Sequence, residues 1–500
     1  MRRLLHIILL LLLPALAVAQ NDSVQQQLWQ TYQRYVDSVN DEYLRYTGQQ
    51  RQSYQRYTDS VSDEFLRYVE QRWQDYRLYT GEHRPTRHEP LRQPVADPSA
   101  TSPDTLSAII VDTAVIHQPD AKPVTNSLSQ NPDSRSLSVY VPFYGLSLDF
   151  SVPAMLGATT LGGHRESHVA DYWRSLNRIG LESCCEQLSR QQRRLQLNDY
   201  ALFRLSMSLA ATLYPSLPDE QCALVVYLLN SLHYNSKVGS SDDGLVILLA
   251  TSNRIYDMPF VEDSRNRYYV FAPASRSKVS GNIKTYNRQL SQSANNLSLY
   301  LSQSPLLGVD ASPKPYTYRF DAGNTLSFAV NRQLIDFYSD YPSVELAVYA
   351  RAAASTDFNQ SVVQGFAPLL ADKVNRQEAV GQLLQYVQRG FDYLPDIRQF
   401  GMEKTFFCEE NFFYPANDCE DRAILFARMV RLLTSLDVVL LEFHDHVAAA
   451  VCFADENVQG TSVRYAGRRY TVCDPTYIDA PVGMLPQRYH NEKPKLIQVL

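Results

Sequence analysis

The first hundred residues carry a repeated helical pattern of apolar positions. The stretch from Tyr32 to Tyr46 recurs 22 residues later as Tyr54 to Tyr68, and a partial third copy begins at Trp73. Apolar side chains within each copy are three or four residues apart, which predicts a helix. Because a lone helix cannot bury such an aromatic stripe, residues 24–82 are predicted to be a coil-forming helical repeat that makes the chain a homo-oligomer; a solvated spacer is the alternative.

The apolar run that precedes the repeat is shorter than a membrane span. Arg2 and Arg3 stand before the apolar residues 4–13, and a run of small residues ends near Ala19. This order is typical of a secretory signal peptide, here residues 1–20, whereas a spanning helix needs about 20 apolar residues. We therefore expect an exported protein, periplasmic or extracellular and not membrane-spanning, with a membrane anchor as the alternative.

Periodicity is lost between residues 83 and 137. Eight of the chain's 26 prolines fall here, among serine, threonine, aspartate and glutamine residues. Such a composition cannot bury enough apolar surface to offset the entropy lost on ordering, so we predict that residues 83–137 are a disordered linker.

From residue 138 onward the pattern predicts an ordered α+β body. Strand-like stretches cover residues 138–150, 244–250, 267–272, 315–320 and 325–330, and helical periodicity covers 169–235 and 375–390. The predicted architecture is a mixed α/β accessory region, residues 138–370, followed by a domain over residues 371–500 in which a helix packs on an antiparallel sheet.

Composition narrows the classes of function. The net charge is −6, with 47 basic and 53 acidic residues, so no basic field favours nucleic acid as a partner. The seven cysteines contain no CxxC pair, so no structural zinc site is indicated. We expect neither a metal nor another cofactor.

Candidate chemistry begins at Cys419. Asn417 or Asp418 would cap a helix that Cys419 opens. The positive end of the helix dipole lowers a thiol pKa and favours the nucleophilic thiolate. Glu420 and Asp421 oppose that effect, so a basic partner is needed.

Two predicted strands provide that partner. His446 opens the stretch 446–453, and Asp474 ends the stretch 469–474. Paired antiparallel strands would place the imidazole between thiol and carboxylate, the order in which a base activates a nucleophile and an acid orients the base. His444, two residues from His446 on the same strand face, remains a rival base.

Residues 371–485 resemble the transglutaminase-like superfamily. The resemblance rests on a cysteine at the start of a helix, a histidine at the start of a strand and an aspartate at the end of the next strand, in this order along the chain. The resemblance implies that Cys419 is the nucleophile, His446 the general base and Asp474 the orienting acid. An aromatic residue often follows the histidine in that family, and Val447 stands there instead, so protein crosslinking is not implied. The region 138–370, where Cys222 lies near a helix start without a His–Asp pair after it, is a candidate for a degenerate copy of the same core.

Two functional hypotheses follow. The first is a secreted cysteine-dependent amide hydrolase or acyl transferase that acts on a peptide or protein, cell-wall peptides included, through an acyl-thioester at Cys419. The second is a non-catalytic scaffold or binding protein that reuses the fold. The presence of all three side-chain types favours the first.

Overall fold

The computed structural model describes most of the chain beyond residue 72. It covers residues 73–97 apart from 86 and 88, then 136–273, 279–286, 295–309, 315–319, 325–453 and 457–499, with isolated helical positions between residues 27 and 49. The chain forms two units, residues 1–64 with 120–132 and residues 65–119 with 133–500. The predicted signal peptide, the second repeat copy and the linker from residue 98 to 135 lie outside the described residues.

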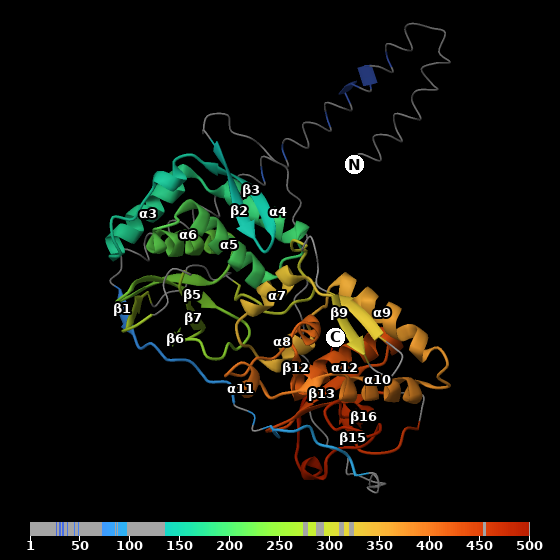
Figure 1. Ribbon diagram of the computed structural model, residues 1–500. Helices are drawn as coiled ribbons and strands as arrows, with labels where there is room; N and C mark the ends of the chain where they lie inside the picture. The colour runs from blue at the N-terminus through green and yellow to red at the C-terminus, as the bar shows by residue number, and fades with distance from the viewer. Residues whose placement is uncertain are drawn as a thin grey trace. The chain divides into compact units, whose positions relative to one another are not determined.

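Two antiparallel sheets organise the second unit, and they confirm the α+β class (Figure 1). The first sheet has the strand order β1 (Gln74–Tyr76), β8 (Ile283–Thr285), β4 (Ser236–Ser241), β5 (Gly244–Ala250), β7 (Arg267–Phe271) and β6 (Phe260–Glu262). The second has the order β15 (Ser462–Tyr465), β16 (Arg468–Cys473), β14 (Val447–Val451), β13 (Val438–Glu442) and β17 (Lys495–Gln498).

One helix packs on each sheet, and a second helix packs against the first. Helix α6 (Pro218–Ser231) packs on β4 and β5 and against α5 (Asp199–Leu213). Helix α12 (Cys419–Thr434) packs on β13 and β14 and against α10 (Arg376–Gly390). The remaining described helices are α3 (Glu166–Ile179), α4 (Glu182–Arg194), α7 (Arg332–Ser339), α8 (Leu346–Ala350), α9 (Thr356–Leu370) and α11 (Asp396–Gln399). None of the described helices is both long enough and apolar enough to cross a bilayer.

Short strand pairs complete the fold. They are β2 (Ser136–Phe143) with β3 (Leu146–Pro153), β9 (Pro315–Arg319) with β10 (Thr325–Ala329), and the parallel pair β11 (Asp392–Tyr393) with β12 (Ala416–Asn417). The parallel pair brings the chain just before α12 beside the end of α10, so it helps to fix where α12 begins.

The two halves share one topology. In each half, a helix is followed by five strands, of which the third pairs with the fourth and the fifth pairs with the first. The strand register repeats as well. For each of three residue pairs in the first sheet, adding 202 to both residue numbers gives two residues that are paired in the second sheet. The recurring partners are Val238–Ile247 with Leu440–Ala449, Ile247–Phe271 with Ala449–Cys473, and Phe260–Tyr269 with Ser462–Thr471.

The first half lacks the candidate catalytic side chains at the matching places. Gly244 and Ala272 stand where the second half has His446 and Asp474, by the same offset of 202. At the mouth of α6, Asp219 accepts a hydrogen bond from the backbone N–H of Leu245 at 2.8 Å. Cys222, suggested by the sequence as an echo of the nucleophile, lies further into the helix and is fully buried.

One hydrophobic core runs through both halves, so the predicted boundary at residue 370 does not separate two cores. The same cluster of buried side chains includes Leu249 from β5, Phe358 from α9 and Leu440 from β13. Stacking of Tyr338 on Phe407, with ring centroids 4.3 Å apart, adds an aromatic contact across that boundary. All seven cysteines are described and buried, and none of them forms a disulfide bond.

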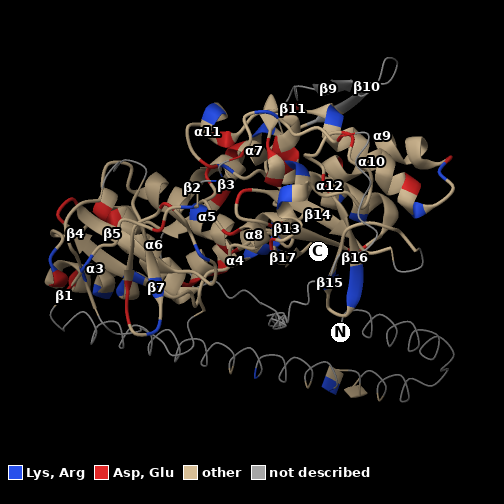
Figure 2. Ribbon diagram, turned by 90° about the horizontal axis from the view of Figure 1, so that it is seen from below, with Lys and Arg blue, Asp and Glu red and all other residues tan. Residues whose placement is uncertain are grey.

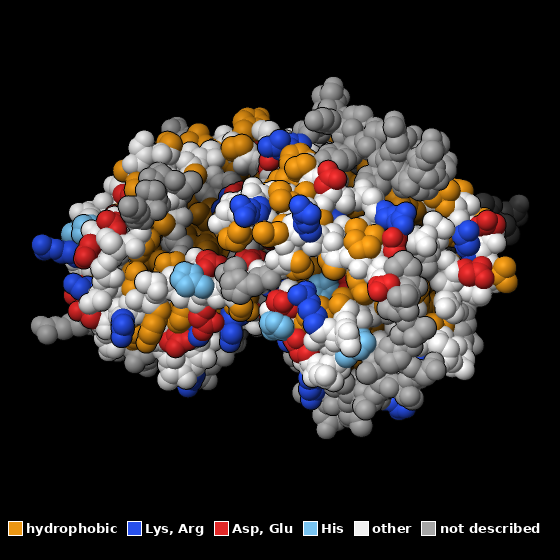
Figure 3. Space-filling view, turned by 60° about the horizontal axis from the view of Figure 1, so that its bottom comes forward, with side chains coloured by type: hydrophobic (Ala, Val, Ile, Leu, Met, Phe, Trp, Pro, Cys, Tyr) orange, Lys and Arg blue, Asp and Glu red, His pale blue; other side chains and the backbone are white. Residues whose placement is uncertain are grey.

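Charged side chains of both signs are interspersed over the body. Lys and Arg as well as Asp and Glu are scattered along the ribbon in Figure 2 and over the face shown in Figure 3. Acidic residues gather beside α11 (Figure 2).

Two expectations for the N-terminal third need correction. Residues 74–76 form β1, which pairs with β8, instead of continuing the helical repeat to residue 82. Residues 83–97, where described, do not behave as a disordered linker, because they run along the body and make backbone and side-chain bonds to it (Figure 1). The compositional argument counted apolar burial alone, whereas this segment is held mainly by polar and charged contacts.

Candidate functional site

Cys419 is the first residue of α12 and lies almost entirely out of solvent. Its side chain is 1% exposed, and Asp418 with Asp421 forms a capping box at the helix start. The sulfur accepts a hydrogen bond from the backbone N–H of Val447 at 3.2 Å. Val447 is the first residue of β14, so this bond ties the thiol to the strand that His446 precedes.

His446 is bonded to Asp474, as the sequence predicted. Its Nε2 lies 2.8 Å from Oδ2 of Asp474, and both side chains are buried. The backbone N–H groups of Thr476 and Tyr477 donate to the other carboxylate oxygen, which fixes the acid. Tyr489 stacks on the imidazole with ring centroids 5.0 Å apart.

This bonding leaves Nδ1 as the basic nitrogen of His446. A carboxylate on Nε2 holds the proton there, so the lone pair falls on Nδ1. Among the described residues Nδ1 has no hydrogen bond, and none joins the ring to the Cys419 thiol. The rival base His444 is 71% exposed in its side chain and binds Glu492 at 2.7 Å, so His446 is the one of the two histidines that is bonded to Asp474.

The thiol is not activated in this conformation, contrary to the expectation from the helix dipole. Burial raises the pKa of Cys419 well above its usual value, and the nearby carboxylates of Glu89 and Glu420 raise it further. The thiol lies 2.8 Å from Oε1 of Glu89 and 3.3 Å from Oε2 of Glu420. A protonated thiol that donates to a carboxylate is a poor nucleophile.

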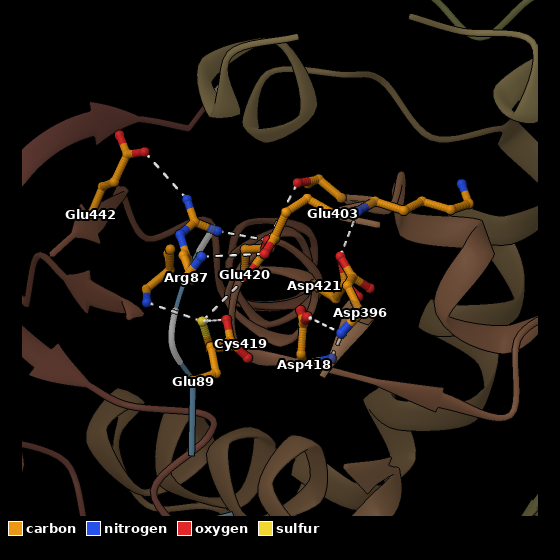
Figure 4. Close-up of polar contacts among 12 residues, drawn as sticks. Arg87, Glu89, Asp396, Glu403, Asp418, Cys419, Glu420, Asp421 and Glu442 are labelled. Carbon is orange, nitrogen blue, oxygen red and sulfur yellow. Dashed lines mark hydrogen bonds and ion pairs between the residues drawn. The ribbon is translucent and has the colours of Figure 1, made fainter. Parts of the chain in front are cut away.

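Glu89 belongs to a segment that we call the strap, comprising Arg87 and residues 89–97. The strap runs beside the start of α12, where Figure 4 shows Arg87 next to Glu420 and Glu89 next to Cys419. Tyr393 donates to the second oxygen of Glu89 at 3.0 Å. Burial, and then Glu420, raises the pKa of Glu89.

Arg87 is the second strap residue at the site. Its guanidinium forms ion pairs with Glu420 at 2.6 Å and Glu442 at 3.3 Å, and its backbone N–H donates to Glu403 at 3.2 Å (Figure 4). The Arg87 side chain is only 8% exposed, and that of Glu420 is fully buried. Burial alone would raise the pKa of Glu420, but Arg87 and then Arg84 outweigh it and lower that pKa to about 2.

Three buried aspartates lie on the other side of Glu420. Oxygens of Asp396, Asp418 and Asp421 approach within 4.8 Å of one another, a donor set that could hold a cation. Backbone N–H groups already use two of these acids, since Lys404 donates to Asp396 at 2.6 Å and Phe406 donates to Asp421 at 2.7 Å. These bonds make the cluster a support for the loop before α12.

The structure places the three candidate residues from the sequence, Cys419, His446 and Asp474, at adjacent element ends. Sequence reasoning missed Arg87 and Glu89, because they lie in a proline-rich stretch more than 300 residues before the thiol. No local pattern in that stretch signals a partner. Comparison with known protein families finds none that matches this chain, and comparison with curated proteins finds no similar sequence.

Proposed function

We propose that this protein is a cysteine-dependent amide hydrolase or acyl transferase that acts on peptides, with Cys419 as nucleophile. The observation that carries the proposal is the fixed His446–Asp474 pair, at 2.8 Å, directly before the backbone N–H that binds the Cys419 sulfur at 3.2 Å. A thiol, a base and an orienting acid in this order are the groups that acyl transfer requires.

The reaction begins when Nδ1 of His446 takes the thiol proton. The thiolate attacks the amide carbonyl, and the new C–S bond gives a tetrahedral oxyanion. The backbone N–H of Cys419, at the open start of α12, is the natural first donor to that oxyanion. Asp474 holds the ring and stabilises the imidazolium.

Collapse of the tetrahedral species breaks the C–N bond. His446 returns its proton to the leaving amine, and an acyl-thioester remains on Cys419. Water, or a second amine, then attacks the thioester with His446 again as base, releasing the acid or a new amide and restoring the thiol. We favour hydrolysis, because no feature of the site marks a place for an amine donor.

The chemistry requires that the thiol leave Glu89 first. With Glu89 gone, one of the carboxylates that raise the thiol pKa is removed, and Nδ1 of His446 can accept the proton. The scaffold hypothesis remains the second candidate, and the observation that favours it is this same contact, since a permanently protonated thiol does no acyl transfer.

The test is alkylation of the full-length chain by iodoacetamide from pH 6 to 9, with peptide mapping, in a Glu89→Ala background. We expect Cys419 to react faster than the buried Cys452, which serves as the internal reference. His446→Ala in the same background should slow labelling near neutral pH. If Cys419 labels no faster than Cys452, and His446→Ala changes nothing, the enzyme hypothesis is wrong and the scaffold stands.

A further inference from the structure

We propose that the strap occupies, within its own chain, the groove that binds the peptide substrate, and that Glu420 and Glu442 form a subsite for an arginine two residues before the residue that meets Cys419. This inference rests on the function proposed above and adds to it a substrate class and a closed state of the site.

The first support is the way the strap's backbone is held. The N–H of Ala96 donates to the carbonyl of Ile478 at 2.8 Å, and the N–H of Ile478 donates to the carbonyl of Pro94 at 2.9 Å, which forms a parallel bridge at Val95. Pairing of an extended segment with a free backbone edge is a general mode of peptide recognition and does not depend on side chains. Because Ile478 follows Asp474 by four residues, the bridge places the strap beside the catalytic strand end.

The second support is the acidic subsite around Arg87. Glu420 is fully buried, and a buried carboxylate that loses its cation is strongly destabilising. Two different nitrogens of the guanidinium face two carboxylates, NH1 toward Glu420 and NH2 toward Glu442. A planar fork fits this arrangement better than the single point charge of a lysine. A peptide that displaces the strap therefore has to supply a guanidinium in its place.

The third support is the group that the strap presents to the thiol. The carboxyl of Glu89 lies 2.8 Å from the sulfur, where an attacked carbonyl would lie. A carboxyl group is a poor electrophile, and the Cys419 thiol is bonded to it instead of to His446. The strap therefore has the position of a substrate without being one.

Because the strap is part of the same chain as the groove, the closed state, in which the strap occupies the groove, is favoured. A tethered ligand acts at an effective concentration on the order of millimolar, so a free peptide of similar affinity competes poorly with it. Displacement requires either a tighter peptide or loss of the strap's own contacts. Cys419 should therefore be protected in the intact protein and accessible once Arg87 and Glu89 are replaced.

The experiment uses the full-length chain and a synthetic decapeptide with the sequence of residues 87–96, Arg-His-Glu-Pro-Leu-Arg-Gln-Pro-Val-Ala. Iodoacetamide labelling of Cys419 is followed in the intact chain and in the Arg87→Ala/Glu89→Ala variant. We expect labelling to accelerate at least about tenfold in the variant, and the decapeptide to restore protection. If the double variant fails to fold, Glu89→Ala alone, which keeps the Arg87 ion pairs, still tests whether loss of the Glu89 contact accelerates labelling of Cys419.

Two matched peptides test the arginine subsite. Citrulline keeps the shape of arginine without its charge, so citrulline at the Arg87 position should weaken protection roughly 10- to 100-fold. Citrulline at the position of Arg92, which is exposed in the intact chain, should change little. Glu442→Gln in the double variant should reduce the preference for arginine.

Each outcome decides a separate claim. Equal protection by the two citrulline peptides overturns the arginine subsite, and fast labelling of Cys419 in the intact chain overturns the closed state. If Cys419 stays unreactive in every variant, the enzyme hypothesis fails. Calorimetric binding of the decapeptide to the double variant then still tests the groove, and absence of binding overturns it.

Discussion

At the scale of single residues, the site combines a fixed base with a thiol that is held inactive. Asp474 orients His446 through Nε2, and a carboxamide at that position could still accept the hydrogen bond. In the Glu89→Ala background, Asp474→Asn should therefore keep a measurable part of the Cys419 alkylation rate near pH 7. His446→Ala should lose more, because it removes the base itself. Equal loss in the two variants would contradict the separate roles.

Asp396 predicts how stability changes with pH. Burial, and then Glu420, raises the pKa of Asp396 to about 8. The folded chain thus holds this proton more tightly than the unfolded chain, whose aspartate pKa is near 4. The resulting stabilisation is complete below about pH 4 and is lost as the pH rises through about 8. Asp396→Asn should flatten this fall in the free energy of unfolding, measured in urea at pH 5, 7 and 9.

A control for that measurement lies on the surface. Asp372 is 78% exposed in its side chain, so Asp372→Asn should leave the pH profile of the parent chain unchanged. An asparagine at position 396 retains the oxygen that accepts the Lys404 N–H, so a general loss of stability is not expected. If both variants keep the parent's pH profile, the raised pKa of Asp396 does not contribute to it.

At the scale of elements, α12 is fixed to its neighbours by a buried arginine. Arg422 is fully buried and donates to the carbonyls of Gln388 at 3.2 Å and Phe391 at 2.8 Å, and to the side chain of Asn417 at 2.8 Å. Arg422→Leu would remove a donor from the buried Asn417 side chain, from the half-buried Phe391 carbonyl and from the Gln388 carbonyl, which keeps its bond from Gln93. A buried acceptor left without a donor costs about 1–3 kcal/mol. We expect a loss of several kcal/mol in urea unfolding.

The matched control for Arg422 is on the same helix. Arg431 pairs with Asp437 at 2.7 Å near the other end of α12, and its side chain is 31% exposed. Partly exposed ion pairs contribute about 0–1 kcal/mol, so Arg431→Leu should change the free energy of unfolding little. A similar loss in both variants would mean that Arg422 does not fix the helix.

The limits of sequence reasoning also show at this scale. Local patterns predicted the helix at Cys419 and the strands near His446 and Asp474, because periodicity and capping are local. They did not predict the 202-residue repeat of strand register, since the two halves bury different side chains at matching places, such as Ile247 and Ala449. Local patterns also did not predict the roles of Arg87 and Glu89, because only folding brings these residues close to Cys419 and Glu420.

At the scale of the whole molecule, the chain before residue 98 has two different roles. The described positions between residues 27 and 49 are helical, while residues 73–97 belong to the folded body through β1 and the strap. A cut at residue 137 would therefore remove a sheet strand and uncover the thiol, whereas a cut at residue 72 would spare both. A deletion up to residue 72 therefore tests assembly through the repeat alone, whereas a longer deletion also tests protection of the thiol by the strap.

The last prediction uses that difference. Deletion of residues 21–72 should leave Cys419 as slow toward iodoacetamide as in the parent, because the strap remains in place. If the 22-residue repeat assembles the protein, the same deletion should convert an oligomer to a monomer in light scattering. Deletion of residues 21–97 should give the same oligomeric state but a faster Cys419, since Glu89 is gone. An oligomeric state that survives both deletions would show that assembly depends on the body, and fast labelling after the shorter deletion would show that the strap needs the repeat to stay closed.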